Sequence, residues 1–135
     1  LEFPEGNACP MYRHPSERPV LQVNGREVYK FAVNAMVTGL QNAVAAAGLK
    51  ESDIDHVMPH QANMRIIGGK AKLSFAPEKY FYNITRYGNT SAACIPMMLD
   101  EANRAGKLKK GDYIAMAAFG GGLTSGSAVL RWNAE

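Results

Sequence analysis

Three stretches of this chain combine chemically capable residues with a position directly after an apolar or β-rich run. The first holds His60 and Asn63 and follows residues 54–59. The second holds Asn89 and follows residues 80–84, and the third is the glycine run 120–122 after residues 113–118. Ligands of open α/β sheets bind beyond the carboxyl ends of strands. We therefore expect His60, Asn89 and the glycine backbone to share one wall of an active site.

Each polar residue in these stretches also has a simpler explanation. A histidine can act as general acid, general base or fixed hydrogen-bond donor near neutral pH, but a single one is more often structural. Asn63 can be the cap of a following helix, and Asn89 can be a turn residue. Arg65 can be a solvated helix residue. These alternatives stay open for each residue taken singly.

The glycine run does not fit the two best-known glycine motifs. A strand rather than a helix is expected after it, so it is not a dinucleotide fingerprint, and no Lys-Ser/Thr pair follows as in a P-loop. Backbone N–H groups free of side chains can stabilise an oxyanion, typically by about 2.7–4 kcal/mol per donor. The alternative is a plain hairpin tip.

Hydrophobic spacing predicts the elements that must position these residues. Residues 1–19 are proline-rich and indicate an extended connector, and residues 20–135 form the domain. Asn24-Gly25 indicates a turn, and Pro96 is expected beyond the first turn of its helix, where it can cause a kink. The resulting order, βαβαβαββ, is typical of an α/β half-domain with a layered sheet and helices. Strands are expected at 20–23, 55–58, 80–84, 113–118 and 127–132, and helices at 27–47, 63–73 and 91–105.

Composition narrows the class of protein. A chain of 135 residues with 47% hydrophobic residues can fill one core. Its 2 cysteines are too few for a disulfide scaffold or a cysteine zinc site, and no three-ligand histidine set is visible, so no metal is expected. A formal charge of +3 does not indicate nucleic acid. No apolar run approaches the ~20 residues of a membrane span, no signal peptide is recognisable, and we expect a cytoplasmic location.

Lysines gather in two places, and the chain starts without methionine. The lysines at 70, 72 and 79 follow the His60 stretch, and those at 107, 109 and 110 precede the last two strands. They form either a solvated face or a docking surface for an acidic partner. The first residues resemble the middle of a longer sequence, which indicates a fragment or an excised domain.

Three motifs together resemble β-ketoacyl-[acyl-carrier-protein] synthase III. They are His60-Gln61-Ala62-Asn63-Met64-Arg65-Ile66, Tyr87-Gly88-Asn89-Thr90-Ser91-Ala92-Ala93 and Ala118-Phe119-Gly120-Gly121-Gly122-Leu123-Thr124, in the family's order and approximate spacing. The resemblance covers roughly residues 20–132. It implies the thiolase fold, of which this chain matches only the carboxyl-terminal half.

The resemblance also implies a reaction and its partners. The family transfers a primer acyl group from acyl-CoA to a cysteine and condenses it with malonyl on the acyl carrier protein, releasing carbon dioxide and initiating fatty acid synthesis. Acyl-CoA and the malonyl-carrier protein are substrates, and no cofactor is implied. The nucleophilic cysteine belongs to the amino-terminal half, and neither Cys9 nor Cys94 matches it. The isolated chain is therefore expected to be inactive, and the full-length enzyme to be a homodimer.

The same resemblance implies roles for individual residues. His60, as a neutral Nε2–H tautomer, and Asn89 would stabilise the enolate that forms on decarboxylation. The backbone N–H of Gly121 would stabilise a second oxyanion. The remaining roles are contact with the pantetheine arm for Asn63, shaping of the cysteine's surroundings for Phe119, and docking of the carrier protein for Arg65.

The sequence leaves two other functions open, and it also predicts how the chain behaves without the amino-terminal half. A related thiolase-fold enzyme for polyketide priming or acyl transfer would use the same histidine and asparagine. A non-catalytic module that binds CoA or carrier protein would keep the fold without turnover. An apolar face left exposed without the amino-terminal half would promote self-association or poor solubility of the isolated chain.

Overall fold

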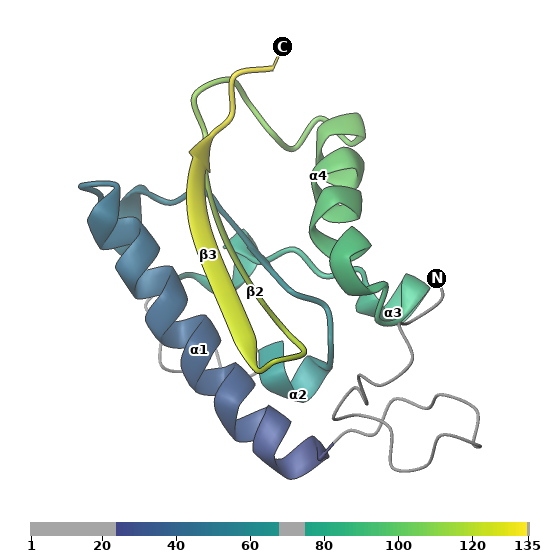
Figure 1. The fold of residues 1–135 in the computed structure, drawn as a ribbon. Helices are drawn as coiled ribbons and strands as arrows, with labels where there is room; N and C mark the ends of the chain where they lie inside the picture. Colours follow the sequence, from purple (N-terminus) through teal and green to yellow (C-terminus); the bar gives the residue numbers. More distant parts are fainter. Residues whose placement is uncertain (1–23, 68–74, 135) are drawn as a thin grey trace, which may run out of the picture.

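A computed structural model describes residues 24–67 and 75–134 of the chain (Figure 1). The expected connector 1–19, the expected strand 20–23, residues 68–73 of the expected second helix, and Lys70 and Lys72 lie outside the described residues. The helices are α1 (Gly25–Ala46), α2 (Met64–Ile67), α3 (Ile84–Tyr87) and α4 (Cys94–Arg104), with single 3₁₀ turns at Glu51–Asp53, Pro77–Lys79 and Ser91–Ala93. The strands are β1 (His56–Pro59), β2 (Tyr113–Gly120) and β3 (Thr124–Arg131).

The three strands form one mixed sheet in the order β1-β2-β3. β1 runs parallel to β2, with Pro59 opposite Ala117, and β2 runs antiparallel to β3, with Gly120 opposite Thr124. Helix α1 lies against one face of the sheet, and α4 lies on the other side (Figure 1). The expected α/β class with a layered mixed sheet is therefore confirmed.

The core lies in two parts, one on each face of the sheet, because neighbouring strand residues point to opposite sides. Val57 and Ala115 pack toward α1, whereas Met58 and Ile114 pack toward α4. The buried residues of α1 recur at four-residue spacing, as the sequence predicted for a helix that covers a sheet. They are Ala32, Met36, Leu40 and Val44.

Close packing of α1 on the sheet depends on a small residue in the helix. A Cβ added at Gly39 would lie 3.1 Å from the Ser127 Oγ on β3. That separation is shorter than ordinary van der Waals contact, so a side chain here would push helix and strand apart. Gly39 thus permits the close approach of α1 to β3.

The start of α1 differs from the turn that Asn24-Gly25 was expected to form. Asn24 is the N-cap of the helix, and its side-chain oxygen accepts a hydrogen bond of 3.4 Å from the backbone N–H of Glu27. Gly25 is the first helical residue. Asparagine is among the preferred N-cap residues, so the same dipeptide begins a helix here.

The expected strand at residues 80–84 is wrong for most of its length. Tyr80 makes one isolated parallel bridge to Val57, and the Phe81 N–H donates to the Val57 carbonyl at 3.0 Å. The chain then turns into α3, because the Gln61 side chain accepts hydrogen bonds from the backbone N–H groups of Asn83 and Ile84. With those groups bonded to a side chain, residues 80–84 form no strand, and the described residues hold three of the four strands expected within them.

Two further expectations about element ends are corrected. Pro96 is the third residue of α4 and so lies within its first turn, where a helix has no internal acceptor for the N–H that proline lacks. No kink is needed there. The last two strands run further than expected, to Gly120 and from Thr124, so the glycine run forms the tip of a hairpin.

Candidate functional site

His60 follows β1 directly and is held at the sheet edge. Its backbone N–H donates to the Ala117 carbonyl on β2 at 2.8 Å, and the residue is only 8% exposed. Its ring Nδ1 lies 2.8 Å from the Cys94 Sγ, and the Phe119 ring meets it edge-on at a centroid distance of 5.1 Å. Three segments distant in sequence thus converge on one imidazole.

The protonation state of His60 follows from this setting. Burial lowers the pKa of the imidazole below its ordinary value, because the cationic form loses hydration. His60 is therefore neutral at pH 7, with one ring nitrogen as donor and the other as acceptor. A neutral N–H can stabilise a developing negative charge without transferring a proton to the neighbouring carbon.

Gln61 clamps the segment that carries His60. The side chain is fully buried, and its amide Nε2 donates to the Pro59 carbonyl at 2.8 Å. Its Oε1 accepts from the backbone N–H groups of Asn83 and Ile84, each at 3.2 Å. Sequence reasoning treated Gln61 only as a flanking residue. The sequence feature that could have indicated this role is the position of Gln61, a polar residue shortly after a strand that was expected to be buried.

Asn63 and Arg65 lie at the start of α2 and are both exposed. The Asn63 Oδ1 accepts a hydrogen bond of 2.8 Å from the backbone N–H of Arg65, and the Asn63 carbonyl accepts from Ile66 and Ile67. The capping explanation for Asn63 therefore holds in the structure. The cap uses the oxygen of the amide, so the donating Nδ2 end takes no part in this bond.

Asn89 lies on the segment between α3 and α4 and is exposed. Its Oδ1 accepts a hydrogen bond of 2.9 Å from the backbone N–H of Ser91, which closes the turn expected for a Gly-Asn-Thr-Ser sequence. The same segment leads through the 3₁₀ turn Ser91–Ala93 into Cys94, which contacts His60. Asn89 thus lies five residues before Cys94, the residue through which this segment contacts the His60 ring.

The glycine run leaves its backbone uncovered. Gly121 is exposed at the hairpin tip, and a Cβ built there would meet no atom within 4 Å. Gly122 has φ near +145°, a conformation that glycine adopts readily, and a Cβ there would lie 2.7 Å from the Thr124 Cγ2. Phe119, two residues before Gly121, connects this tip to the His60 ring.

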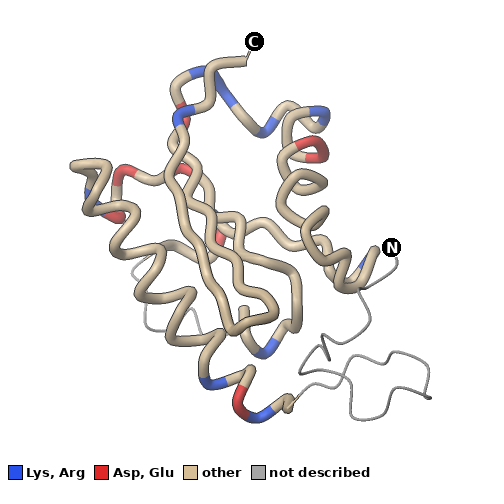
Figure 2. Tube along the Cα trace, in the orientation of Figure 1, with Lys and Arg blue, Asp and Glu red and all other residues tan. Residues whose placement is uncertain are grey.

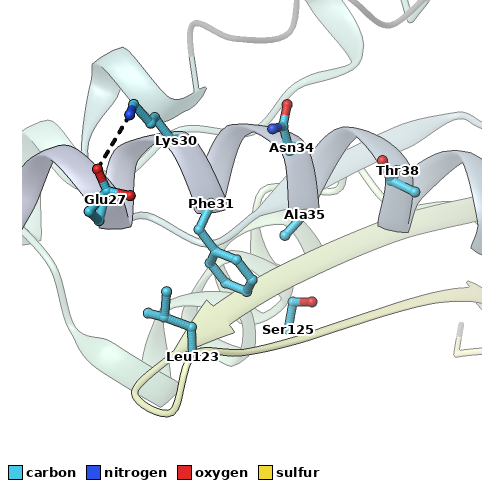
Figure 3. A pocket seen from close by; sticks show the side chains of 8 residues that line it. All are labelled: Glu27, Lys30, Phe31, Asn34, Ala35, Thr38, Leu123 and Ser125. Atoms are coloured by element: carbon cyan, nitrogen blue, oxygen red, sulfur yellow. Dashed lines mark hydrogen bonds and ion pairs between the residues drawn. The ribbon is translucent and has the colours of Figure 1, made fainter.

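An open groove lies between the first half of α1 and the hairpin tip (Figure 3). The Phe31 ring points from the helix toward Leu123 and Ser125 of the hairpin (Figure 3). Lys30, on the rim, forms an ion pair of 3.3 Å with Glu27. Leu123 is 48% exposed, so the groove is a surface feature beside the glycine backbone rather than an enclosed pocket.

The described lysines do not gather around Arg65. Lys79 donates to the carbonyls of Ser52 and Ile54, which links the segment before β1 to the 3₁₀ turn Pro77–Lys79. The loop carrying Lys107, Lys109 and Lys110 lies at the opposite end of the sheet from α2 (Figure 2). The α2 end instead holds the start of α1, with exposed Arg26 and Lys30.

The described residues contain neither a group of metal ligands nor a helix that could cross a membrane. Within residues 24–67 and 75–134, no three His, Cys, Asp or Glu side chains are grouped so that they could hold a metal ion. In the same part of the chain, no helix combines the length and the apolar character needed to cross a membrane.

The three motifs and their arrangement agree with a family match. Residues 44–132 match the family model described as 3-oxoacyl-[acyl-carrier-protein (ACP)] synthase III, C terminal. The chain belongs to this family. The match contains His60, Asn89 and the glycine hairpin, and it ends at Trp132.

Relatives and solved structures agree with the family match. The chain is 50% identical over 113 residues to the β-ketoacyl-[acyl-carrier-protein] synthase III of Clostridium acetobutylicum, covering 83% of this chain and 35% of that protein. It resembles the synthase III structure from Thermus thermophilus with a TM-score of 0.85 and 45% identity, over 95% of this chain and 41% of that one. The chain thus has the fold of a thiolase-like half and spans about a third of its relatives' length.

A second similar structure is the priming β-ketosynthase of the R1128 polyketide biosynthetic pathway. The TM-score is 0.79 and the identity 32%, over 86% of this chain and 35% of that one. The fold is therefore nearly as similar as that of the Thermus thermophilus structure, while the sequence is more distant.

Proposed function

We propose that this chain is the carboxyl-terminal part of a condensing acyltransferase, with residues 20–135 as its domain and 1–19 as a connector. The complete enzyme joins a primer acyl group from acyl-CoA to malonyl-acyl carrier protein and so initiates fatty acid synthesis. One observation carries the proposal: a neutral, buried His60 is fixed at the end of β1, between Phe119 and Cys94. The family match and the 50% identity to a synthase III support the same reaction class.

In this proposal His60 and Asn89 stabilise the enolate formed on decarboxylation. The bond between the malonyl α-carbon and its carboxylate breaks, carbon dioxide leaves, and the electron pair moves toward the thioester oxygen. The Nε2–H of His60 and the side-chain N–H of Asn89 donate to that oxygen. In this turn Asn89 accepts with its oxygen, so its Nδ2 group is the donor that the chemistry requires.

The next step forms the carbon–carbon bond. The α-carbon attacks the acyl thioester on a cysteine of the amino-terminal half, and the cysteine thiolate leaves as the tetrahedral oxyanion collapses. The Gly121 N–H donates to this oxyanion, and the bare hairpin backbone supports that role.

Substrate positioning is assigned to three further residues. Asn63 contacts the pantetheine arm, Phe119 shapes the surroundings of the nucleophile, and Arg65 docks the acidic carrier protein. Arg65 is exposed at the end of the sheet that also carries the start of α1, so an acidic partner can reach both. No resident cofactor takes part, and the complete enzyme is a cytoplasmic homodimer.

Polyketide priming is the second candidate, because the R1128 priming synthase shares the fold at 32% identity. The higher identity to the synthase III relatives, 50% and 45%, favours fatty acid initiation. A module that binds CoA or carrier protein without turnover is the third. Product analysis with carrier proteins from each pathway distinguishes the first two, and the variants below test the third.

The experiment joins this chain with a separately expressed amino-terminal half from the Clostridium acetobutylicum relative. Acetyl-CoA and malonyl-carrier protein are supplied, and carbon dioxide release and the ketoacyl product are followed. His60→Ala and Asn89→Ala should each lower turnover by about 10²–10³-fold, the usual effect of losing one oxyanion donor. His56→Ala is the matched control and should stay within about threefold of the wild type, because His56 lies at the other end of β1.

Equal turnover in all four proteins would show that His60 and Asn89 are structural and would favour the binding module. If no mixture turns over, the two sequences are fused into one chain and the same variants are compared again.

A further inference from the structure

Cys94 is a buried thiol that the proposed reaction leaves without a role. It is the first residue of α4, is 2% exposed, and places its Sγ 2.8 Å from the His60 Nδ1. Among the residues that the structure describes, it is the hydrogen-bond partner of the His60 ring. The contact joins segments 34 positions apart in the sequence.

The chemistry of the two groups decides which of them donates. A neutral imidazole has one N–H donor and one nitrogen acceptor, whereas a thiol is a weak donor and a weak acceptor. The imidazole nitrogen is the stronger acceptor of the pair, so the better bond runs from the thiol S–H to Nδ1. In that arrangement Nδ1 has no hydrogen, and the ring hydrogen is on Nε2.

We propose that Cys94 is a positioning residue that donates its S–H to the His60 Nδ1 and so holds the imidazole as the Nε2–H tautomer. The inference rests on the proposed function, in which that N–H stabilises the enolate. The thiol touches neither substrate nor reacting atoms, and its effect passes through the orientation and tautomer of His60. The edge-on Phe119 ring, at 5.1 Å, limits the ring's rotation from another side.

One alternative is an ion pair between a Cys94 thiolate and a His60 imidazolium. However, both residues are more than nine-tenths buried, and burying two charges needs further hydrogen bonds to offset lost hydration. The neutral pair has no such requirement.

The test is nitrogen NMR of the 135-residue chain labelled with ¹⁵N-histidine, recorded at pH 7.5. Unprotonated and protonated ring nitrogens differ widely in chemical shift, so the spectrum separates the two neutral tautomers and the imidazolium. The His60 signals are assigned from the spectrum of His60→Gln. Wild-type His60 should show an unprotonated Nδ1 and a protonated Nε2. Protonation of Nδ1, alone or together with Nε2, would overturn the proposal without any thiol variant.

Two substitutions then test the thiol itself. Cys94→Ser keeps a donor at the same place and should retain the Nε2–H tautomer, whereas Cys94→Val has similar bulk without a donor and should give a mixture with Nδ1–H. An unchanged tautomer in Cys94→Val would contradict the proposal. His56 is the internal control, because its Nε2 donates to the Asp112 carboxylate and should give the same signals throughout. If Cys94→Val does not fold, Cys94→Ala replaces it.

In the reassembled enzyme, Cys94→Val should lower kcat about tenfold with KM unchanged, and Cys94→Ser should stay within about threefold of the wild type. The tautomer is measured on the chain alone, so the two ideas can fail separately. A Cys94-dependent tautomer without turnover would count against the proposed function and leave the positioning role intact. Turnover in the reassembled enzyme, together with a His60 tautomer that does not depend on Cys94, would support the proposed function and contradict the positioning role.

Discussion

The two histidines at the ends of β1 have matching geometry and different partners. His56 begins the strand, lies 2.8 Å from the Asp112 carboxylate and meets the Phe81 ring edge-on at 5.6 Å. His60 follows the strand, lies 2.8 Å from the Cys94 thiol and meets the Phe119 ring edge-on at 5.1 Å. Each imidazole therefore has one polar partner and one edge-on contact with a phenylalanine ring.

The difference in partner assigns the two rings to different tasks. The Asp112 carboxylate accepts a hydrogen bond from the His56 ring, which suits a structural link between β1 and the start of β2. A buried thiol brings no charge, so His60 stays neutral and keeps a polarised N–H. A histidine thus has a structural role at the start of β1, where His56 bonds to Asp112, and a candidate role as oxyanion donor directly after β1, where His60 lies.

The largest expected effect concerns Gln61, which anchors the His60 end through neutral hydrogen bonds. Gln61→Leu leaves the backbone N–H groups of Asn83 and Ile84 buried without an acceptor, and each such group costs about 1–3 kcal/mol. We expect the free energy of unfolding to fall by about 3 kcal/mol in urea titrations. Gln41→Leu, at an exposed position of α1, is the matched control and should change it by less than about 0.5 kcal/mol. Equal losses in both would mean that Gln61 is not an anchor.

A smaller effect is expected at Asp112, the partner of His56. Burial acts to raise the pKa of this carboxyl, but hydrogen bonds from the Lys109 N–H and from His56 lower it overall. The charged form is therefore stabilised by folding. This contribution is complete above the unfolded pKa of about 3.9 and is lost as pH falls through the lowered folded pKa.

Asp112→Asn should accordingly lower the free energy of unfolding by about 1–2 kcal/mol at pH 7, since hydrogen bonds to charged groups contribute somewhat more than neutral ones. The gap between variant and wild type should narrow at pH 3. Urea unfolding at both pH values provides the measurement. Asp100→Asn, which removes the exposed ion pair with Arg104, should cost less than about 0.5 kcal/mol. A gap that widens in acid would overturn the assignment.

The smallest expected effect is the acid sensitivity of His60. Its folded pKa is lowered by burial, so the unfolded chain binds more protons between that value and the ordinary value of about 6.5. Its contribution to stability is complete above pH 6.5 and declines as the pH falls below it, by at most about 1.4 kcal/mol per pH unit. Unfolding free energies from pH 8 to 5.5 should fall more steeply for the wild type than for His60→Gln. Parallel slopes would show that burial does not disfavour the imidazolium.

Local sequence patterns were enough to predict several elements. The spacing of Ala32, Met36, Leu40 and Val44 predicted α1, and β-rich runs around a glycine turn predicted the final hairpin, because both patterns reflect burial on one face. Element ends were less predictable. Asn24 was expected in a turn and caps a helix, since the two uses of asparagine look alike in sequence.

The sequence by itself determined the family, the α/β class and the set of candidate residues, because these depend on residue types at short spacing. Tertiary structure alone decided what each candidate touches. The expected strand at residues 80–84 became a single bridge because Gln61, about twenty positions away, binds its backbone. Cys94 does not match the family's nucleophile, yet the fold places its thiol against the His60 ring. The contacts of Gln61 and of Cys94 each join residues that are distant in the sequence. They depend on how the end of β1 packs against other elements, which cannot be predicted from a local sequence pattern.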